Sequence, residues 1–131
     1  MPHPQMFADD DPALARVRAL ALALPGAQEK VSHGRPAFFT TKVFAYYGGS
    51  HKVDGDWHEH PQCLMVLLDE DERTALLEED RSFVPAYLGP SGWLGVDLPA
   101  PDERGWDEVA ELLDASFRLT APVRLVRELD G

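Results

Sequence analysis

The centre of this 131-residue sequence reads Gln62-Cys63-Leu64-Met65-Val66-Leu67-Leu68, and its last six residues are apolar without a break. A strand with one face in water alternates apolar and polar residues, whereas a strand covered on both faces does not. The run therefore predicts a strand at the centre of a sheet, and Asp69 marks its end.

The sequence after this strand predicts a helix and two short strands. Asp69 and Glu72 form a capping-box pattern that begins a helix running through Glu79. Short strands are expected at residues 82–84 and 93–97. The loop between them reads Tyr87-Leu88-Gly89-Pro90-Ser91-Gly92-Trp93, and its glycines and proline favour a rigid turn.

Apolar periodicity predicts the other helices. Asp11 and Pro12 are suited to begin a helix, which we expect to run to Leu24. Apolar residues recur at helical spacing again between Trp106 and about Arg118. Pro122 can open a further short helix.

The segments between the first helix and the central strand have β character. Residues 28–33, 36–40 and 43–47 predict a meander. Residues 48–61 are polar and rich in histidine, so we expect a loop insertion there, and residues 1–10 are expected to form a mobile tail. The prediction is one α+β domain over residues 11–131, in the order α-β-β-β-β-α-β-β-α.

The composition indicates how many domains the chain forms and whether it spans a membrane or contains a disulfide. Hydrophobic residues make up 44% of the chain, which supplies a core for one domain. The apolar stretches are shorter than the roughly 20 residues of a membrane-spanning helix, and no secretory signal pattern opens the chain. Cys63 is the only cysteine, which excludes an internal disulfide. We expect a cytoplasmic monomer with no membrane partner and no cofactor.

Charge is unevenly distributed along the chain. The formal net charge is -11, which disfavours indiscriminate attraction to polyanions. Residues 12–53 nevertheless hold six basic side chains against one acid, whereas residues 54–114 hold 17 acids against three arginines. Three more arginines, Arg118, Arg124 and Arg127, follow near the end of the chain. These faces are either solvated or form a basic surface for a partner.

Several motifs in this order resemble the MmcQ/YjbR family. They are Ala23-Leu24-Pro25-Gly26 followed by Glu29, then Ser32-His33-Gly34-Arg35-Pro36-Ala37-Phe38, Lys42-Val43-Phe44-Ala45, the Tyr87 to Trp93 loop and the helix from Trp106 to Leu119. The resemblance extends from Pro12 to Leu125. It implies a curved antiparallel sheet of five to six strands flanked by helices, and a DNA-binding role.

The Tyr87 to Trp93 loop is the first candidate site. Tyr87 and Trp93 either pack on the sheet or form a platform on which a base or another planar group stacks. We expect Arg35 to be the arginine nearest the loop, with His33 and Lys42 as further candidates. If the basic residues share one exposed face, Arg16, Arg18 and Arg124 belong to the same ligand-binding surface.

Residues 48–61 raise the question of a metal site. His51, His58 and His60 are chemically able to bind Zn²⁺ or Ni²⁺. Their spacing matches no closed structural zinc pattern, and Cys63 opens an apolar strand, where a thiol is usually a buried apolar group. We favour no metal site and keep the three histidines as weak candidates.

The sequence lacks the motifs of the common enzyme classes. It contains no Gly-x-Ser-x-Gly elbow, Walker loop, dinucleotide-binding glycine pattern or His-Glu-x-x-His. Ser32 and His33 are neighbours on a predicted strand and should point to opposite faces. The leading hypothesis is therefore a non-catalytic binding module, and the family resemblance implies nucleic acid as its ligand. The alternatives are a small-molecule-binding or enzymatic domain that uses a cleft beside the loop, and a protein-interaction adaptor.

Overall fold

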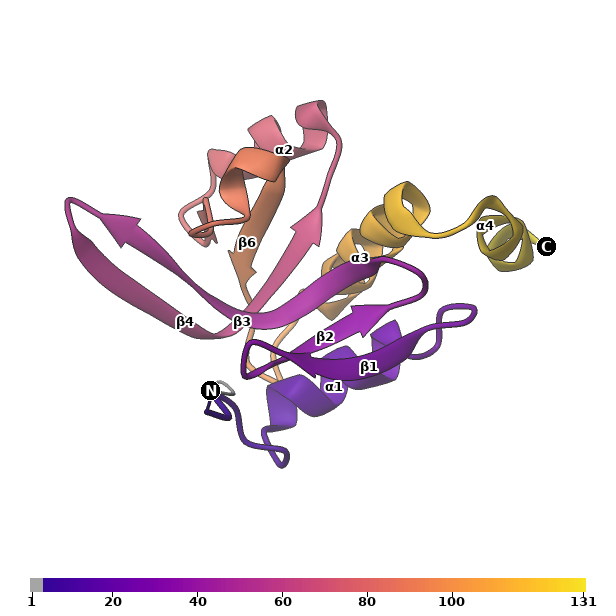
Figure 1. Cartoon of the computed structure of the whole chain (residues 1–131), viewed down its shortest axis with the longest axis horizontal. Helices are drawn as coiled ribbons and strands as arrows, with labels where there is room; N and C mark the ends of the chain where they lie inside the picture. Colours follow the sequence, from indigo (N-terminus) through magenta and orange to yellow (C-terminus); the bar gives the residue numbers. More distant parts are fainter. Residues whose placement is uncertain (1–3) are drawn as a thin grey trace.

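A computed structural model describes residues 4–131 and shows an antiparallel sheet with helices packed against it (Figure 1). The helices are α1 (Pro12–Ala21), α2 (Glu70–Leu77), α3 (Trp106–Thr120) and α4 (Val123–Asp130), with a 3₁₀ turn η1 at Gly89–Ser91. The strands are β1 (Gln28–Ser32), β2 (Arg35–Phe39), β3 (Val43–Val53), β4 (Asp56–Leu67), β5 (Ser82–Phe83) and β6 (Trp93–Asp97). The six strands lie in the order β1-β2-β3-β4-β6-β5, which confirms the predicted α+β class.

The predicted central strand is confirmed. Cys63 to Leu67 of β4 pair with β6 on one side, while β3 pairs with β4 on the other. Leu64 and Val66 pack in the larger core cluster, and Cys63 and Met65 pack in a smaller one. Because successive side chains point to opposite faces, these two clusters lie on opposite faces of the sheet.

Helices cover one face of the sheet, which we call the helix face. Leu14 and Val17 of α1 and Leu113 and Phe117 of α3 are buried there. The Phe117 ring meets Phe44 of β3 edge to face, with 5.5 Å between ring centroids. α1 ends at Ala21, short of the predicted Leu24. The described residues contain no helix long and apolar enough to cross a membrane.

The opposite face, which we call the loop face, carries the smaller cluster. Cys63, Met65, Phe83 and Trp93 are buried in it, and Tyr46, Leu67 and Leu88 pack against it. The segment 84–92 returns over this face, because the Ala86 amide donates to the Ser50 carbonyl at 2.9 Å. The candidate site described below lies on this face.

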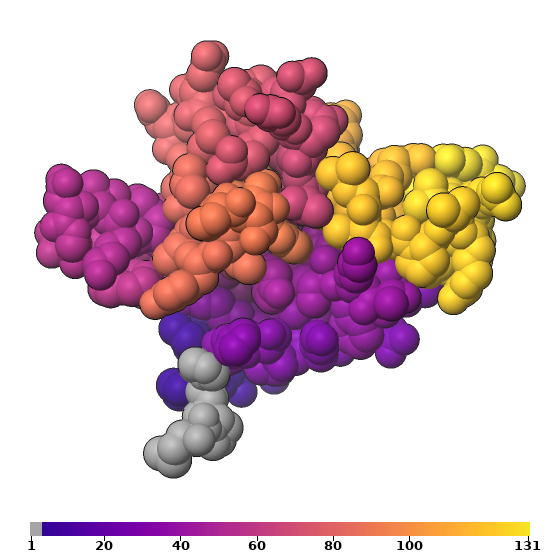
Figure 2. All heavy atoms as spheres, turned by 45° about the horizontal axis from the view of Figure 1, so that its top comes forward, coloured from indigo at the N-terminus to yellow at the C-terminus, as the bar shows by residue number. Residues whose placement is uncertain are grey.

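The structure contradicts the loop expected at residues 48–61. β3 and β4 continue through this segment as a long hairpin that projects from the body of the protein (Figures 1 and 2). Asp54 and Gly55 connect the strands with φ angles of 51° and 86°. Positive φ at both positions is what a two-residue hairpin turn with right-handed twist requires, and Asp-Gly is a favoured sequence for it. The polar composition of residues 48–61 was typical of a loop, because the two strands there do not pack in the core.

The N-terminal segment makes defined contacts in its described part. The Met6 amide donates to the Gly34 carbonyl at 2.8 Å, and Asp9 forms an ion pair with Arg18 at 3.0 Å. Phe7 packs against the helix-face core. Residues 4–10, which were expected to be mobile, thus lie against the β1–β2 turn and α1, while residues 1–3 fall outside the described part of the chain.

Candidate ligand-binding cleft

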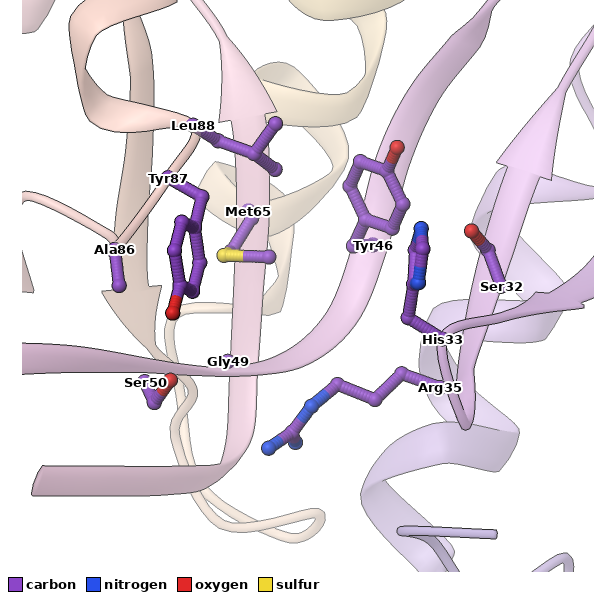
Figure 3. A pocket seen from close by; sticks show the side chains of 10 residues that line it. All are labelled: Ser32, His33, Arg35, Tyr46, Gly49, Ser50, Met65, Ala86, Tyr87 and Leu88. Atoms are coloured by element: carbon purple, nitrogen blue, oxygen red, sulfur yellow. The ribbon is translucent and has the colours of Figure 1, made fainter. Parts of the chain in front are cut away.

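The loop face contains a cleft of about 540 Å³ between the β1–β2 turn, the base of the long hairpin and the segment 84–92 (Figure 3). These three parts are distant in sequence and meet because β2, β3, β4 and β6 are successive neighbours in the sheet and the segment 84–92 leads into β6. The lining residues are Ser32, His33, Arg35, Tyr46, Gly49, Ser50, Met65, Ala86, Tyr87 and Leu88.

Tyr87 forms one wall of the cleft. The residue is 86% exposed, although its backbone is held by hydrogen bonds on either side, from Leu88 to Ala86 and from Gly89 to Pro85. Its φ angle of 66° is unusual for a residue with a side chain. A residue held in this conformation while its ring faces water points to a functional constraint.

Tyr46 and His33 form the opposite wall, and Met65 lies between the walls (Figure 3). Tyr46 is half-buried, and this burial raises the pKa of its hydroxyl. His33 has a φ of 52°, which turns its side chain toward the same space as that of Ser32. The prediction that Ser32 and His33 point to opposite faces is therefore wrong, because His33 belongs to a turn and not to a strand.

Arg35 enters the cleft from below the walls (Figure 3). Its side chain is only 13% exposed, and Nη2 donates to Oε2 of Glu59 at 2.9 Å. Nη1 lies 2.5 Å from the position that a Cβ would occupy at Gly48, so the glycine leaves room for the guanidinium. Glu59 is 59% exposed at the outer end of this pair.

The structure separates the two aromatic residues of the predicted platform. Trp93 is only 9% exposed and packs edge to face on Tyr46, with 5.3 Å between ring centroids. It supports the cleft wall from within the sheet. Tyr87 alone faces outward, and its ring lies 6.1 Å from that of Trp57 on the hairpin.

The other predicted basic residues lie elsewhere. Arg16 donates to the Pro101 carbonyl at 2.7 Å and lies over the Trp106 ring on the helix face. Arg18 forms ion pairs with Asp9 and Glu29, which raise its pKa. The remaining two are exposed, Lys42 before β3 and Arg124 on α4, and neither lines the cleft.

The three candidate metal ligands lie together at the base of the hairpin, where His51 and His60 are joined by a hydrogen bond and His58 is in ring contact with His51. His51 Nδ1 lies 2.7 Å from His60 Nε2, and His60 Nδ1 lies 2.7 Å from Oδ1 of Asp97. His58 stacks on His51, and His60 stacks on Phe83. Over residues 4–131, no group of three or more His, Cys, Asp or Glu side chains is arranged to hold a metal ion.

Two further groups in this region have shifted pKa values. Desolvation, together with the neighbouring His60 and His58, lowers the pKa of His51. Burial raises the pKa of the Cys63 thiol well above its usual range. The thiol therefore stays protonated and packs as an apolar group, which makes it a poor nucleophile or metal ligand.

The chain is similar to a known protein family in sequence and to a solved protein in structure. A family model described as YjbR matches residues 22–119. Among solved structures, the Deinococcus radiodurans protein DR2400, described with the domain DUF419, is similar with a TM-score of 0.56 and 17% sequence identity. The match covers 99% of this chain and 91% of that one, and at this identity it shows a shared fold alone. No curated protein matches the chain.

Proposed function

The chain belongs to the YjbR family, and we propose that within this family it acts as a non-catalytic binding module whose ligand is a small organic molecule held in the cleft. The observation that carries the proposal is the cleft itself. Its volume of about 540 Å³ falls within the range of roughly 300–1,000 Å³ typical of small-molecule sites.

The lining has the composition of a binding site. Tyr46, Met65, Leu88 and Tyr87 supply apolar and aromatic surface. A few polar groups, among them the Ser50 hydroxyl and the Arg35 guanidinium, converge on the same space. Such sites bind through apolar contact and use their few polar groups to orient the ligand.

The distribution of positive charge favours a small ligand over nucleic acid. Arg16 and Arg18 lie on the helix face and Arg35 on the loop face, so they cannot contact one nucleic-acid backbone together. Arg18 and Arg35 are also paired with carboxylates. Nucleic-acid affinity depends on many phosphate contacts made at once. This arrangement supports the small-molecule alternative over the role that the family resemblance implies.

The proposal is tested by two-dimensional NMR of ¹⁵N-labelled protein against a metabolite library, with single-stranded and duplex DNA as separate arms. We expect library compounds to shift the amide resonances of Ser50, Ala86, Tyr87 and Leu88. Tyr87→Ala should abolish these shifts, while Val123→Ala, an exposed apolar residue on α4, should leave them unchanged. Binding of DNA in preference to every compound, or compound-induced shifts confined to other surfaces, would contradict the proposal.

A further inference from the structure

The geometry of the cleft points to one class of ligand: we propose that it selects a flat ring that carries a single negative charge. The ring lies between Tyr87 on one side and Tyr46 with His33 on the other, and the anion binds Arg35 in place of Glu59. This inference rests on the proposed function, because it names the ligand of the same cleft.

The walls argue for a flat ring. Tyr87 and Tyr46 come from separate parts of the chain and face the same space from opposite sides, with the Met65 thioether between them (Figure 3). Aromatic rings pair favourably in stacked or edge-to-face arrangements, and thioethers make favourable contacts with ring edges. A planar ring therefore adds stacking and thioether–ring contacts to the apolar contact that a branched aliphatic group of similar size would also make.

The Tyr87 ring is available for this purpose. Its neighbours hold it at a positive φ, and the Ala86–Ser50 hydrogen bond ties its loop to the hairpin. A ring whose backbone is already fixed loses little conformational freedom on binding. The backbone that carries this wall is thus in place before the ligand arrives, and only the side-chain torsions of Tyr87 are left to order.

Arg35 argues for an anion. A guanidinium has five N–H donors in a fixed plane, and among the described residues the Arg35 side chain makes one hydrogen bond, to Glu59. Its remaining donors can accept a carboxylate in the two-bond geometry that arginine favours. Since Arg35 is almost buried, it cannot swing out to solvent, so it stays at the base of the cleft.

Glu59 is the group that the ligand replaces. The Glu59 side chain is 59% exposed, so water solvates its released charge well, while the almost buried Arg35 stays paired because the ligand anion replaces the carboxylate. Glu59 can therefore turn into solvent while the ligand anion takes its place on Arg35. In the absence of ligand, Glu59 keeps the arginine neutralised.

The electrostatics limit the ligand to one negative charge. Arg35 is the one permanently charged cation among the lining residues, and the displaced Glu59 remains close by. The formal net charge of -11 adds a repulsive field that grows with every further negative charge on the ligand. A monoanion is attracted by one contact, whereas a polyanion meets no second arginine or lysine among the described lining residues.

The test compares indole-3-acetate, its neutral analogue indole-3-acetamide and adenosine 5′-monophosphate as NMR probes of the wild-type protein. We expect the acetate to bind at the cleft roughly tenfold more tightly than the amide, which is the scale of one hydrogen bond to a charged group. The dianionic nucleotide should bind more weakly than the acetate. Equal affinity of acetate and amide, or preference for the dianion, would overturn the inference.

Two variants with the same charge change isolate Glu59. Glu59→Gln removes the competitor of the ligand and should tighten acetate binding several-fold, with little effect on the amide. Glu111→Gln, at an exposed position on α3, changes the net charge equally and should have a much smaller effect. Arg35→Gln should abolish the preference for the acetate. If Glu59→Gln weakens acetate binding, Glu59 contacts the ligand and the exchange is wrong.

The outcomes separate this inference from the proposed function. If both indoles shift the cleft resonances equally, the cleft binds small molecules and only the named class fails. If neither indole shifts them while other library compounds do, the class again fails alone. If no compound shifts them, the proposed function fails and this inference fails with it.

Discussion

At Ser116 a single hydroxyl joins three elements of the fold. This fully buried residue of α3 donates to the Phe44 carbonyl at 2.5 Å and accepts from the Leu67 amide at 2.9 Å. The two backbone groups belong to β3 and β4. The hydroxyl therefore fixes how α3 sits on the two central strands.

Replacing Ser116 tests this role. Ser116→Ala leaves a buried carbonyl and a buried amide without this partner, and we expect it to lower the free energy of unfolding by about 2–4 kcal/mol. Ser91→Ala, at an exposed position of η1, serves as the control and should change it by less than about 0.5 kcal/mol. Urea unfolding measures both, and similar small effects would show that α3 is held by its apolar contacts alone.

Tyr47 anchors the start of α1 from the sheet. Its hydroxyl lies 2.5 Å from Oδ2 of Asp11, the residue that caps the helix through the Ala13 amide. Burial and the Asp11 charge raise the pKa of Tyr47 well above its usual range, so the phenol stays protonated and donates. The N-terminus of the helix is thereby tied to β3.

The matched pair Tyr47→Phe and Tyr87→Phe removes one hydroxyl each from a buried and an exposed tyrosine. Tyr47→Phe should lower the free energy of unfolding by about 1.5–3 kcal/mol, because it removes a hydrogen bond to a charged group. Tyr87→Phe should leave it nearly unchanged. Thermal and urea unfolding give both values, and equal effects would argue against a structural role for the Tyr47 hydroxyl.

Single residues also show where the sequence was insufficient. The motif predicted that a rigid loop fixes Tyr87 and Trp93, but their fates differ. Trp93 opens β6 with its ring toward the sheet interior, whereas the positive φ of Tyr87 is fixed by hydrogen bonds within its own loop and to β3. Contacts from a distant strand leave no local pattern, so sequence periodicity does not reveal which ring is exposed.

Among the helices and strands, those that are buried in the core show the clearest pattern in the sequence. The central part of β4 and the helix α3 were predicted correctly because burial imposes a pattern on their residues. The outer half of the β3–β4 hairpin was taken for a loop because neither of its faces is buried. The Asp54-Gly55 pair was the available signal for that hairpin.

The imidazole cluster at the hairpin base should make the free energy of unfolding depend on pH. Because burial and neighbouring imidazoles lower the pKa of His51, the folded chain binds that proton less tightly than the unfolded chain does. The unfolded chain takes up the proton as the pH falls below about 6.5, the usual histidine value. The stabilisation by neutral His51 is thus complete above this pH and is lost below it.

We expect the free energy of unfolding to fall between about pH 6.5 and pH 5.5, and His51→Gln to reduce this slope. His58→Gln keeps the His51–His60 hydrogen bond and should retain most of it. Urea unfolding at several pH values measures the slopes. An unchanged slope in His51→Gln would place the titrating group elsewhere.

The short β5–β6 pairing depends on a glycine. A Cβ at Gly95 would stand 2.2 Å from Cζ of Phe83, the ring on which His60 stacks. Gly95→Ala should therefore destabilise the protein by about 1–3 kcal/mol through overpacking. The double variant with Phe83→Leu should lose less stability than the sum of the single variants, as measured in a double-mutant cycle. Additive losses would mean that contact with the Phe83 ring is not the cause of the loss at Gly95.

At the scale of the whole molecule, the sheet divides the positive charge. The sequence has a basic segment at residues 12–53. Consecutive residues on a strand point to opposite faces of the sheet, and residues on a helix point around the helix axis. Neighbouring basic residues in the sequence can therefore lie on different surfaces. Arg18 and Arg35 belong to the same basic segment and lie on opposite sides of the sheet. Charge in a sequence segment becomes a charged surface only after the topology is known.

This division predicts poor binding of duplex DNA. At physiological salt, the dissociation constant should be weaker than about 10⁻⁴ M, the weak end of non-specific protein–DNA binding. Fluorescence anisotropy with a labelled duplex over a range of salt concentrations provides the measurement. Micromolar affinity that falls steeply with salt would reveal a phosphate-binding surface and restore the role implied by the family resemblance.

The hairpin that projects from the body has a consequence for how this protein varies among relatives. Within the described chain, Gly49–Val53 and Asp56–His60 pair with each other and with no third strand. Residues can therefore be gained or lost in pairs, one from each strand, without changing the register of the core sheet. The hairpin can therefore become longer or shorter, or change its side chains, during evolution while the rest of the fold stays the same. The length of the β3–β4 hairpin should thus vary more among relatives than that of any other part of the fold, and relatives should differ there by even numbers of residues.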